Sequence, residues 1–165
     1  MKATFERVQT PKQIDLIVQL ANTIWIEHYT SIIGKEQVTY MLETFHSAQT
    51  ISEQVEAVNI YYYLILHDKK LVGYMGIREN QKSLFLSKLY LLAQERHYGI
   101  GSQAIAHIKA LASSKALKII TLTVNKNNIN SIKAYQKMGF KITRDICSDI
   151  GEGYVMDDYE MELMV

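Results

Sequence analysis

The chain has 165 residues, 48% of them hydrophobic and 21% charged, which is typical of a globular protein, and we predict a single domain over residues 1–165. Its formal net charge of +1 excludes the basic excess of dedicated nucleic-acid-binding proteins. With no signal peptide and no apolar run near the ~18 residues of a membrane span, we expect a cytoplasmic protein without nucleic-acid or membrane partners.

The first third of the chain predicts one strand followed by helices. A short strand is expected at 3–8, and Pro11 stands where a helix can begin. The helical spacing of apolar residues then predicts one amphipathic face, made by Ile17, Leu20, Ala21, Ile24, Trp25 and His28. A second helix is expected after Gly34, and a third over about 47–58.

From residue 61 onward the pattern changes to strands. Aromatic and β-branched residues at 61–66 and 71–77 flank a polar turn and predict a hairpin. The later elements are expected as strands at 84–92, 119–124, 140–147 and 154–165, with helices at 100–112 and 128–138. The strand–helix–strand unit at 84–124 should be a right-handed parallel crossover. This order predicts a three-layer α/β fold, with a mixed sheet and helices on both faces.

The segment at 89–104 predicts a phosphate-binding turn between a strand and a helix. Gly99 and Gly101 let the backbone approach a ligand closely, helix N-terminal amides suit a phosphate, and Arg96 adds a charged donor. With Ala104 the glycines also satisfy a loose dinucleotide-binding pattern. That pattern needs an acidic residue about 20 positions later to hold the ribose, and no Asp or Glu occurs between Ala104 and Arg144. The glycines alone are equally compatible with a tight structural turn.

A block without acidic residues follows this turn. It contains seven lysines, namely Lys109, Lys115, Lys118, Lys126, Lys133, Lys137 and Lys141. A field of one sign beside a phosphate-binding turn attracts a polyanion, and coenzyme A carries a pyrophosphate and a ribose phosphate. Each lysine by itself is also compatible with an ordinary solvated surface.

Two motifs together resemble the Gcn5-related N-acetyltransferase (GNAT) superfamily. Residues 96–101 match its Q/R-x-x-G-x-G/A signature. The second motif follows in the right order and at the right separation, as Asn128, Ser131, Tyr135, Gly139 and Phe140. The resemblance covers nearly the whole chain and implies the GNAT fold, a mixed and mostly antiparallel sheet whose central parallel strand pair is splayed for CoA.

The resemblance implies that acetyl-CoA is the acyl donor, with no metal. Pantetheine would lie in the splayed gap against the backbone of Leu89 and Leu91, where a backbone N–H would polarise the thioester carbonyl. The implied binding residues are Leu89, Tyr90, Leu91, Arg96, His97, Tyr98, Gly99, Ile100, Gly101, Ser102, Asn128, Ser131 and Lys137.

Tyr135 is the candidate general acid that the resemblance implies. A phenol near the sulfur can supply a proton to the departing CoA thiolate. Without the resemblance, a tyrosine ring packed in the core is the simpler interpretation. Cys147 is the single cysteine, which excludes an internal disulfide. We interpret it as a small apolar strand residue rather than as a nucleophile.

The general base is not evident, because Ser87 and Lys88 stand where many relatives have a Glu on the central strand. Glu27 and His28, on the first helical region that borders the acceptor site in relatives, are the candidates for a base or an acceptor-site residue. His28 has a suitable ordinary pKa, although it also sits on the apolar helix face. Glu79, at the end of a strand, is another possibility.

The C-terminal part of the chain bears on the acceptor. Residues 145–165 carry seven acids and no Lys or Arg, namely Asp145, Asp149, Glu152, Asp157, Asp158, Glu160 and Glu162. Such an acidic strip suits a cationic acceptor such as a polyamine, an aminoglycoside or a basic peptide end. It is also compatible with a solvated sheet edge whose acids balance the lysines. The ending, with Trp25 and Tyr29, resembles bacterial Pai-type polyamine acetyltransferases. Tyr40 and the three consecutive tyrosines at 61–63 are further aromatic residues that could line a pocket for an aliphatic amine.

The leading hypothesis is acetyl transfer from acetyl-CoA to a primary amine of a small molecule, polyamine-like, by direct attack in a ternary complex. A CoA-binding sensor without turnover, a protein or peptide N-acetyltransferase, and a nucleotide-dependent oxidoreductase are the alternatives. Apolar strand edges near the C-terminus, and the dimers common among relatives, add a homodimer to the expectations.

Overall fold

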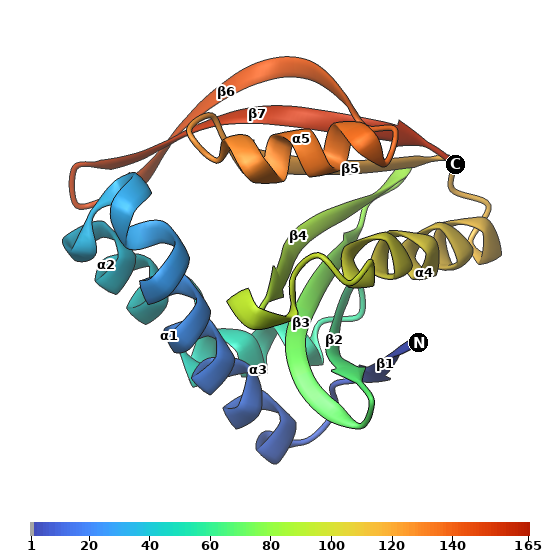
Figure 1. Cartoon of the computed structure of the whole chain (residues 1–165), viewed down its shortest axis with the longest axis horizontal. Helices are drawn as coiled ribbons and strands as arrows, with labels where there is room; N and C mark the ends of the chain where they lie inside the picture. The colour runs from blue at the N-terminus through green and yellow to red at the C-terminus, as the bar shows by residue number, and fades with distance from the viewer. Residues whose placement is uncertain (1) are drawn as a thin grey trace.

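The computed structural model describes residues 2–165 as a seven-stranded sheet in the order β1-β2-β3-β4-β5-β7-β6 (Figure 1). The strands are β1 (Ala3–Arg7), β2 (Ile60–His67), β3 (Lys70–Glu79), β4 (Ser83–Leu91), β5 (Ile119–Asn125), β6 (Lys141–Gly151) and β7 (Tyr154–Met164). The helices are α1 (Pro11–Ile33), α2 (Lys35–Phe45), α3 (Ala48–Glu56), α4 (Ile100–Ser114) and α5 (Ile129–Lys137), with a 3₁₀ turn η1 (Ala93–Glu95).

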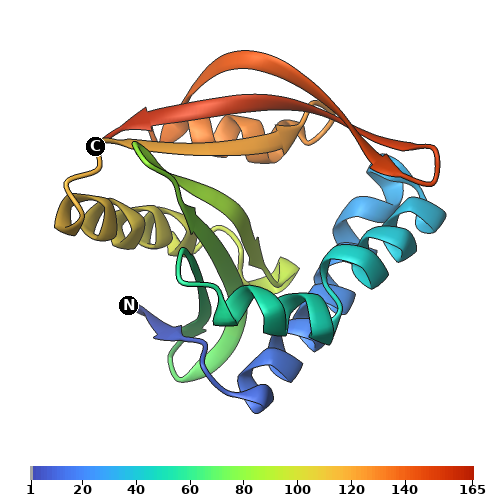
Figure 2. The same ribbon diagram turned by 180° about the vertical axis from the view of Figure 1, so that it is seen from behind.

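The predicted α/β fold class is confirmed. Within residues 2–165, β4 and β5 form the one parallel pair, and the other neighbouring strands are antiparallel. Helices α1 to α3 cover one face of the sheet, and α4 and α5 cover the other (Figures 1 and 2). A doubly wound dinucleotide-binding sheet, which is mostly parallel, is therefore ruled out.

Helix α1 carries several residues of the site and begins where the sequence predicts. Thr10 caps it by accepting from the Gln13 backbone N–H, the Gln13 side chain returns to the Thr10 backbone, and Pro11 occupies the first turn. The helix continues to Ile33 and ends at Gly34, which has a φ of 88°. No helix in residues 2–165 is long and apolar enough to cross a membrane. The cytoplasmic location stays a prediction.

Strand β6 is longer than predicted. The sequence placed a strand at 140–147, whereas the structure has Lys141–Gly151, paired with β7 through Ser148↔Met156 and Asp149↔Val155. Most of β6 is exposed, so no apolar alternation marks where it ends. The end of the hairpin lies beside α2 in both views (Figures 1 and 2).

Two hydrogen bonds tie this hairpin to α2. The Tyr40 hydroxyl donates to the Ile150 carbonyl at 2.6 Å, and the Gln37 amide donates to the Val155 carbonyl at 3.1 Å. These bonds fix the end of the β6–β7 hairpin against α2.

The central strands separate as the resemblance implied. Strand β4 pairs with β5 only over Ser83–Leu86, opposite 119–122, and beyond this point the two diverge (Figure 1). Lys88 faces Gly76 and Leu86 faces Ile77, so Ser87 is the extra residue of a β-bulge where pairing with β5 stops.

The ladder between β3 and β4 shows which backbone groups face the gap. The Leu92 N–H donates to the Val72 carbonyl at 2.9 Å. Because bonded and non-bonded pairs alternate in an antiparallel ladder, the backbone groups of Leu91 and Leu89 point away from β3 and toward β5. The gap is therefore edged by peptide groups that β5 does not pair.

Candidate functional site

A cleft of about 1040 Å³ occupies the gap between β4 and β5. One part of it, here called the α4 arm, is bounded by the N-terminus of α4 and by α5, and includes Gly101 and Ser131. The other part, here called the α1 arm, lies between the sheet and α1 and α2, and includes Trp25 and Met41. Both arms meet along β4, so one continuous cleft joins a helix N-terminus to an aromatic pocket.

The turn before α4 leaves backbone amides without a side-chain cap. Gly99 is the N-cap residue with a φ of 76°, and no side chain caps the helix there. The amides of residues 100–102 are therefore available to a ligand, and their partial positive charge favours phosphate. A Cβ at Gly101 would meet only the Met138 methyl at 3.5 Å, and Gly101 lines the cleft. The residues present fit the pyrophosphate of coenzyme A.

Most of the cofactor residues expected from the sequence line this cleft, namely Leu89, Tyr90, Leu91, Arg96, His97, Gly99, Ile100, Gly101, Ser102, Asn128, Ser131 and Lys137. The Tyr98 side chain does not line it. Tyr98 is 64% exposed, and its ring lies beside His67.

Arg96 binds protein groups as well as facing the cleft. Its guanidinium donates to the Leu91 carbonyl at 3.1 Å, and a second nitrogen lies 3.5 Å from His28 Nδ1. Arg96 therefore links the end of β4 to α1, a role that the sequence motif did not reveal.

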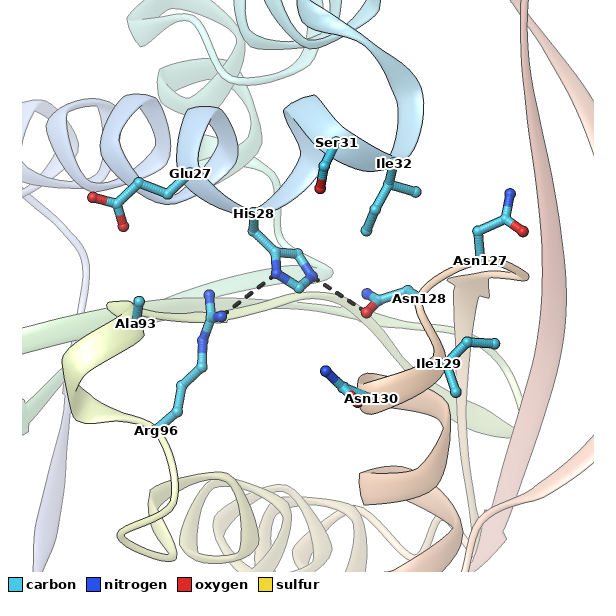
Figure 3. Close-up of a pocket in the computed structure, with 10 residues that line it drawn as sticks. All are labelled: Glu27, His28, Ser31, Ile32, Ala93, Arg96, Asn127, Asn128, Ile129 and Asn130. Carbon is cyan, nitrogen blue, oxygen red and sulfur yellow. Dashed lines mark hydrogen bonds between the residues drawn. The ribbon is translucent and has the colours of Figure 1, made fainter.

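A smaller cavity of about 370 Å³ opens beside the junction of the two arms (Figure 3). His28 lies at its centre, with Nε2 3.2 Å from Asn128 Oδ1 and Nδ1 toward Arg96. Burial and the Arg96 charge lower the pKa of His28, against the Asn128 contact that raises it. Glu27 lines this cavity but not the large cleft, and its side chain is exposed.

Tyr135 projects from α5 into the large cleft, with its ring 5.5 Å from that of Phe140. Its hydroxyl has no hydrogen-bond partner among the described residues. Burial raises the pKa of Tyr135, so the phenol stays protonated at neutral pH. The structure thus combines the two interpretations of this residue, because its ring packs against Phe140 and the residue also lines the cleft.

Asp158 is a cleft residue that the sequence did not single out. The β5–β7 register places it opposite Asn125, where it is 7% exposed and its Oδ1 atom has no partner among residues 2–165. Burial, with the neighbouring Asp157 charge, raises the pKa of Asp158 to about 6, against the opposing effect of Lys126. It is the single acidic residue among those that line the cleft.

Several other acids are already paired. Lys126 lies 3.0 Å from carboxylate oxygens of both Asp145 and Asp157. Glu160 pairs with Arg144 at 3.0 Å. Much of the acidic strip therefore balances basic residues, and Asp158 is the member that faces the cleft.

Glu79 is not placed to act as a base. It forms an ion pair with Lys115 at 2.9 Å and accepts from the Tyr61 hydroxyl, and it does not line the cleft. These two contacts lower the pKa of the Glu79 carboxyl. Within residues 2–165, no group of three or more His, Cys, Asp or Glu side chains is arranged to hold a metal ion.

Aromatic rings form the wall of the α1 arm. Trp25 lies 4.4 Å from Tyr29, 4.9 Å from His46 and 5.4 Å from Tyr90, measured between ring centroids. Of the predicted aromatic candidates, Trp25 and Tyr29 line the cleft, whereas Tyr40 and residues 61–63 do not. Burial raises the pKa of Tyr29 to about 12. His46, which follows α2, had no signal in the sequence.

Comparison with known proteins gives one family match. Residues 19–140 match the family described as the acetyltransferase (GNAT) family. The spermidine N(1)-acetyltransferase of Thermoplasma acidophilum is 21% identical over 135 residues, which cover 79% of this chain and 84% of that protein.

Solved structures show the same fold. The PaiA N-acetyltransferase of Thermoplasma acidophilum, in complex with coenzyme A, aligns over 100% of both chains with a TM-score of 0.84 and 18% identity. Arabidopsis thaliana Naa50, in complex with the bisubstrate analogue CoA-Ac-MVNAL, aligns over 99% of each chain with a TM-score of 0.68 and 22% identity. At these identities the likeness shows the fold and leaves the acceptor open.

Proposed function

This chain belongs to the acetyltransferase (GNAT) family, and we propose that it transfers an acetyl group from acetyl-CoA to a primary amine of a small molecule by direct attack in a ternary complex. One observation carries the proposal. A single cleft contains an uncapped helix N-terminus, a protonated phenol and a buried carboxyl group.

Acetyl-CoA would bind along the α4 arm. The amides of residues 100–102 would hold its pyrophosphate, with Lys137 adding positive charge at the cleft wall. Pantetheine would lie between the separated strands, against the backbone groups of Leu91 and Leu89 that point toward β5. The Leu89 N–H, just after the bulge, is our candidate to stabilise the developing oxyanion of the thioester.

The chemistry then needs two proton transfers. The neutral amine nitrogen attacks the thioester carbon, a new C–N bond forms, and the C–S bond breaks. We propose that Asp158, directly or through water, takes the proton that the amine loses. Tyr135 gives its proton to the departing thiolate. The base role goes to Asp158 because this residue lines the cleft and its buried Oδ1 atom has no partner within residues 2–165, whereas His28 is held by Asn128 and Arg96.

Two features favour this function over the alternatives. A CoA sensor without turnover would have no use for an unpartnered Tyr135 hydroxyl and Asp158 carboxyl in one cleft. A peptide acceptor would need a broad open groove, whereas Tyr40 and Gln37 tie the β6–β7 hairpin to α2 beside the α1 arm. A polyamine remains the acceptor that the name of the Thermoplasma relative suggests.

The test is acetyl-CoA-dependent thiol release with a panel of amines. The panel holds di- and polyamines, aminoglycosides, amino acids and basic peptides, and CoA binding is measured in parallel. Release with one class of small amine is the expected result. Tight CoA binding without release from any amine would contradict the proposed transfer.

Ser102→Asp should separate CoA binding from folding. Ser102 is exposed in the first turn of α4, where an acid interacts favourably with the helix dipole and leaves the melting temperature unchanged or higher. The same charge would repel pyrophosphate, so we expect the Kd for CoA to rise about 10- to 100-fold. Calorimetry and thermal melting measure both effects.

Ser113→Asp is the matched control, since it adds the same charge near the other end of α4. It should leave CoA affinity unchanged. Equal CoA affinity in wild type and Ser102→Asp would show that the pyrophosphate binds elsewhere.

A further inference from the structure

One group of side chains in the α1 arm has no role in the proposed transfer. Arg78 and Lys88 line the cleft from strands β3 and β4, together with His46 after α2 and Gln54 on α3. We call these four residues the donor cluster. They lie on the side of the sheet that α1 to α3 cover, since Lys88 Nζ lies 5.4 Å from the Tyr62 ring, which packs in that core.

Among residues 2–165, the two cations of the cluster have no counter-ion. Neither Lys88 nor Arg78 forms an ion pair or hydrogen bond within residues 2–165. Burial, with a smaller effect of Arg78, lowers the pKa of Lys88 to about 8. Lys88 is half-buried and Arg78 is exposed. Of the two, only the Lys88 charge is removed in part from water, and a partly desolvated ammonium group is stabilised by a nearby anion.

His46 is also unsatisfied. It is 4% exposed, and neither ring nitrogen has a hydrogen-bond partner within residues 2–165. Burial and then the Lys88 charge lower the pKa of His46 to about 3, against a backbone contact with Met41 that raises it, so the ring is neutral and offers one N–H donor. The Met41 contact does not have the geometry of a hydrogen bond. A buried polar ring that lines a cleft without a partner points to a ligand atom there.

Gln54 completes the set as a donor. Its Oε1 atom is engaged because it accepts the Tyr62 hydroxyl hydrogen. The amide nitrogen, which can only donate, is left for a ligand. The cluster therefore offers a guanidinium, an ammonium, a neutral imidazole and an amide nitrogen, with no carboxylate among its members.

We propose that the donor cluster binds an anionic group of the acceptor, so that the preferred acceptor is an amine that also carries a carboxylate or a phosphate. Asp158 lies on β7, opposite Asn125 at the end of β5, whereas the cluster lies on β3, β4 and the α2–α3 region, and Asp158 would receive the amine end. The α1 arm would thus hold a molecule with opposite charges at its two ends. A polyamine would instead place a second ammonium against Lys88 and Arg78. The inference rests on the proposed acetyl transfer.

The experiment compares amines that differ only at the far end. Amino carboxylates of several chain lengths, including α-amino acids, are assayed beside their neutral carboxamides, the matching diamines and the aminoalkyl phosphates. We expect kcat/KM for an anionic acceptor to exceed that of its matched amide and diamine by about 10- to 100-fold. The carboxylate and phosphate arms show which anion the cluster accepts.

Variants of Lys88 connect this preference to the cluster. Lys88→Met keeps an unbranched side chain that ends one atom short of the lysine nitrogen and removes its charge, so the preference for the anion should fall about tenfold or more through the acceptor KM. The KM for acetyl-CoA and turnover of the neutral amide should not change. Lys88→Arg should keep the preference, and Lys133→Met, at an exposed lysine of α5, should have no effect.

The outcomes separate this inference from the function beneath it. Turnover of diamines or neutral amides as good as that of the anionic amines, or a preference unaffected in a folded Lys88→Met protein, would overturn the anion site alone. Failure with every amine despite CoA binding would overturn the proposed transfer, and the inference with it.

Discussion

Replacing Tyr135 with Phe is expected to lower kcat by about 100-fold or more, which is the typical effect of removing a positioned general acid. The Phe ring can keep the contact with Phe140, and the lost hydroxyl has no internal hydrogen bond, so the protein should melt at the wild-type temperature. The KM for acetyl-CoA should change little. Steady-state thiol release and thermal melting measure these effects.

Tyr154→Phe is the matched control. Tyr154 packs against Tyr40 at the β6–β7 hairpin and does not line the cleft, so the same chemical change should leave kcat unaltered. If Tyr135→Phe kept full activity while folded, the thiolate would have to leave without this proton, and the assigned role would be wrong.

Replacing Asp158 with Asn should lower kcat/KM by about 100-fold or more and remove its dependence on pH near 6. In the wild type, a base whose pKa is about 6 must be ionised, so activity should fall as the pH drops below that value. Asn cannot ionise, so the acid limb of the profile should disappear. A pH–rate profile between about 5 and 9 would show both effects. This range lies between the ordinary pKa values of a carboxyl group and an amine.

The Asp158→Asn protein should lose activity without losing thermal stability. Burial raises the folded pKa of Asp158 above its unfolded value, so the native state binds the proton more tightly, and this contribution to stability is lost as the pH rises through about 6. Asn removes a buried charge. At pH 8, the Asp158→Asn protein should therefore melt no lower than the wild type.

Asp157→Asn is an informative control at the next residue. Asp157 is paired with Lys126 and does not line the cleft, so activity should persist. Its charge helps to raise the pKa of Asp158, and without it the acid limb should shift to lower pH. A limb that stays in place in Asp157→Asn and survives in Asp158→Asn would assign the titration to another group.

Much of the fold was readable from local patterns. Helix α1 begins at Pro11 because the capping residues are adjacent in sequence, and α5 ends before Gly139, which has a φ of 102°. The hairpin of β2 and β3 follows from runs of aromatic and β-branched residues on either side of a short polar turn. The end of β6 was not readable, since its exposed residues carry no alternation that burial would impose.

In the candidate site too, some residues were predictable from local sequence motifs and others were not. The sequence by itself marked the glycine turn at Gly99 and the residue Tyr135, both of which line the cleft, because each is carried by a short motif whose spacing matters locally. Only the tertiary structure placed Asp158 and His46 in the cleft. A long-range strand register places Asp158 opposite Asn125, and the packing of α2 on α1 brings His46 against Trp25. Such contacts depend on burial between distant segments, and no local spacing of residues records them.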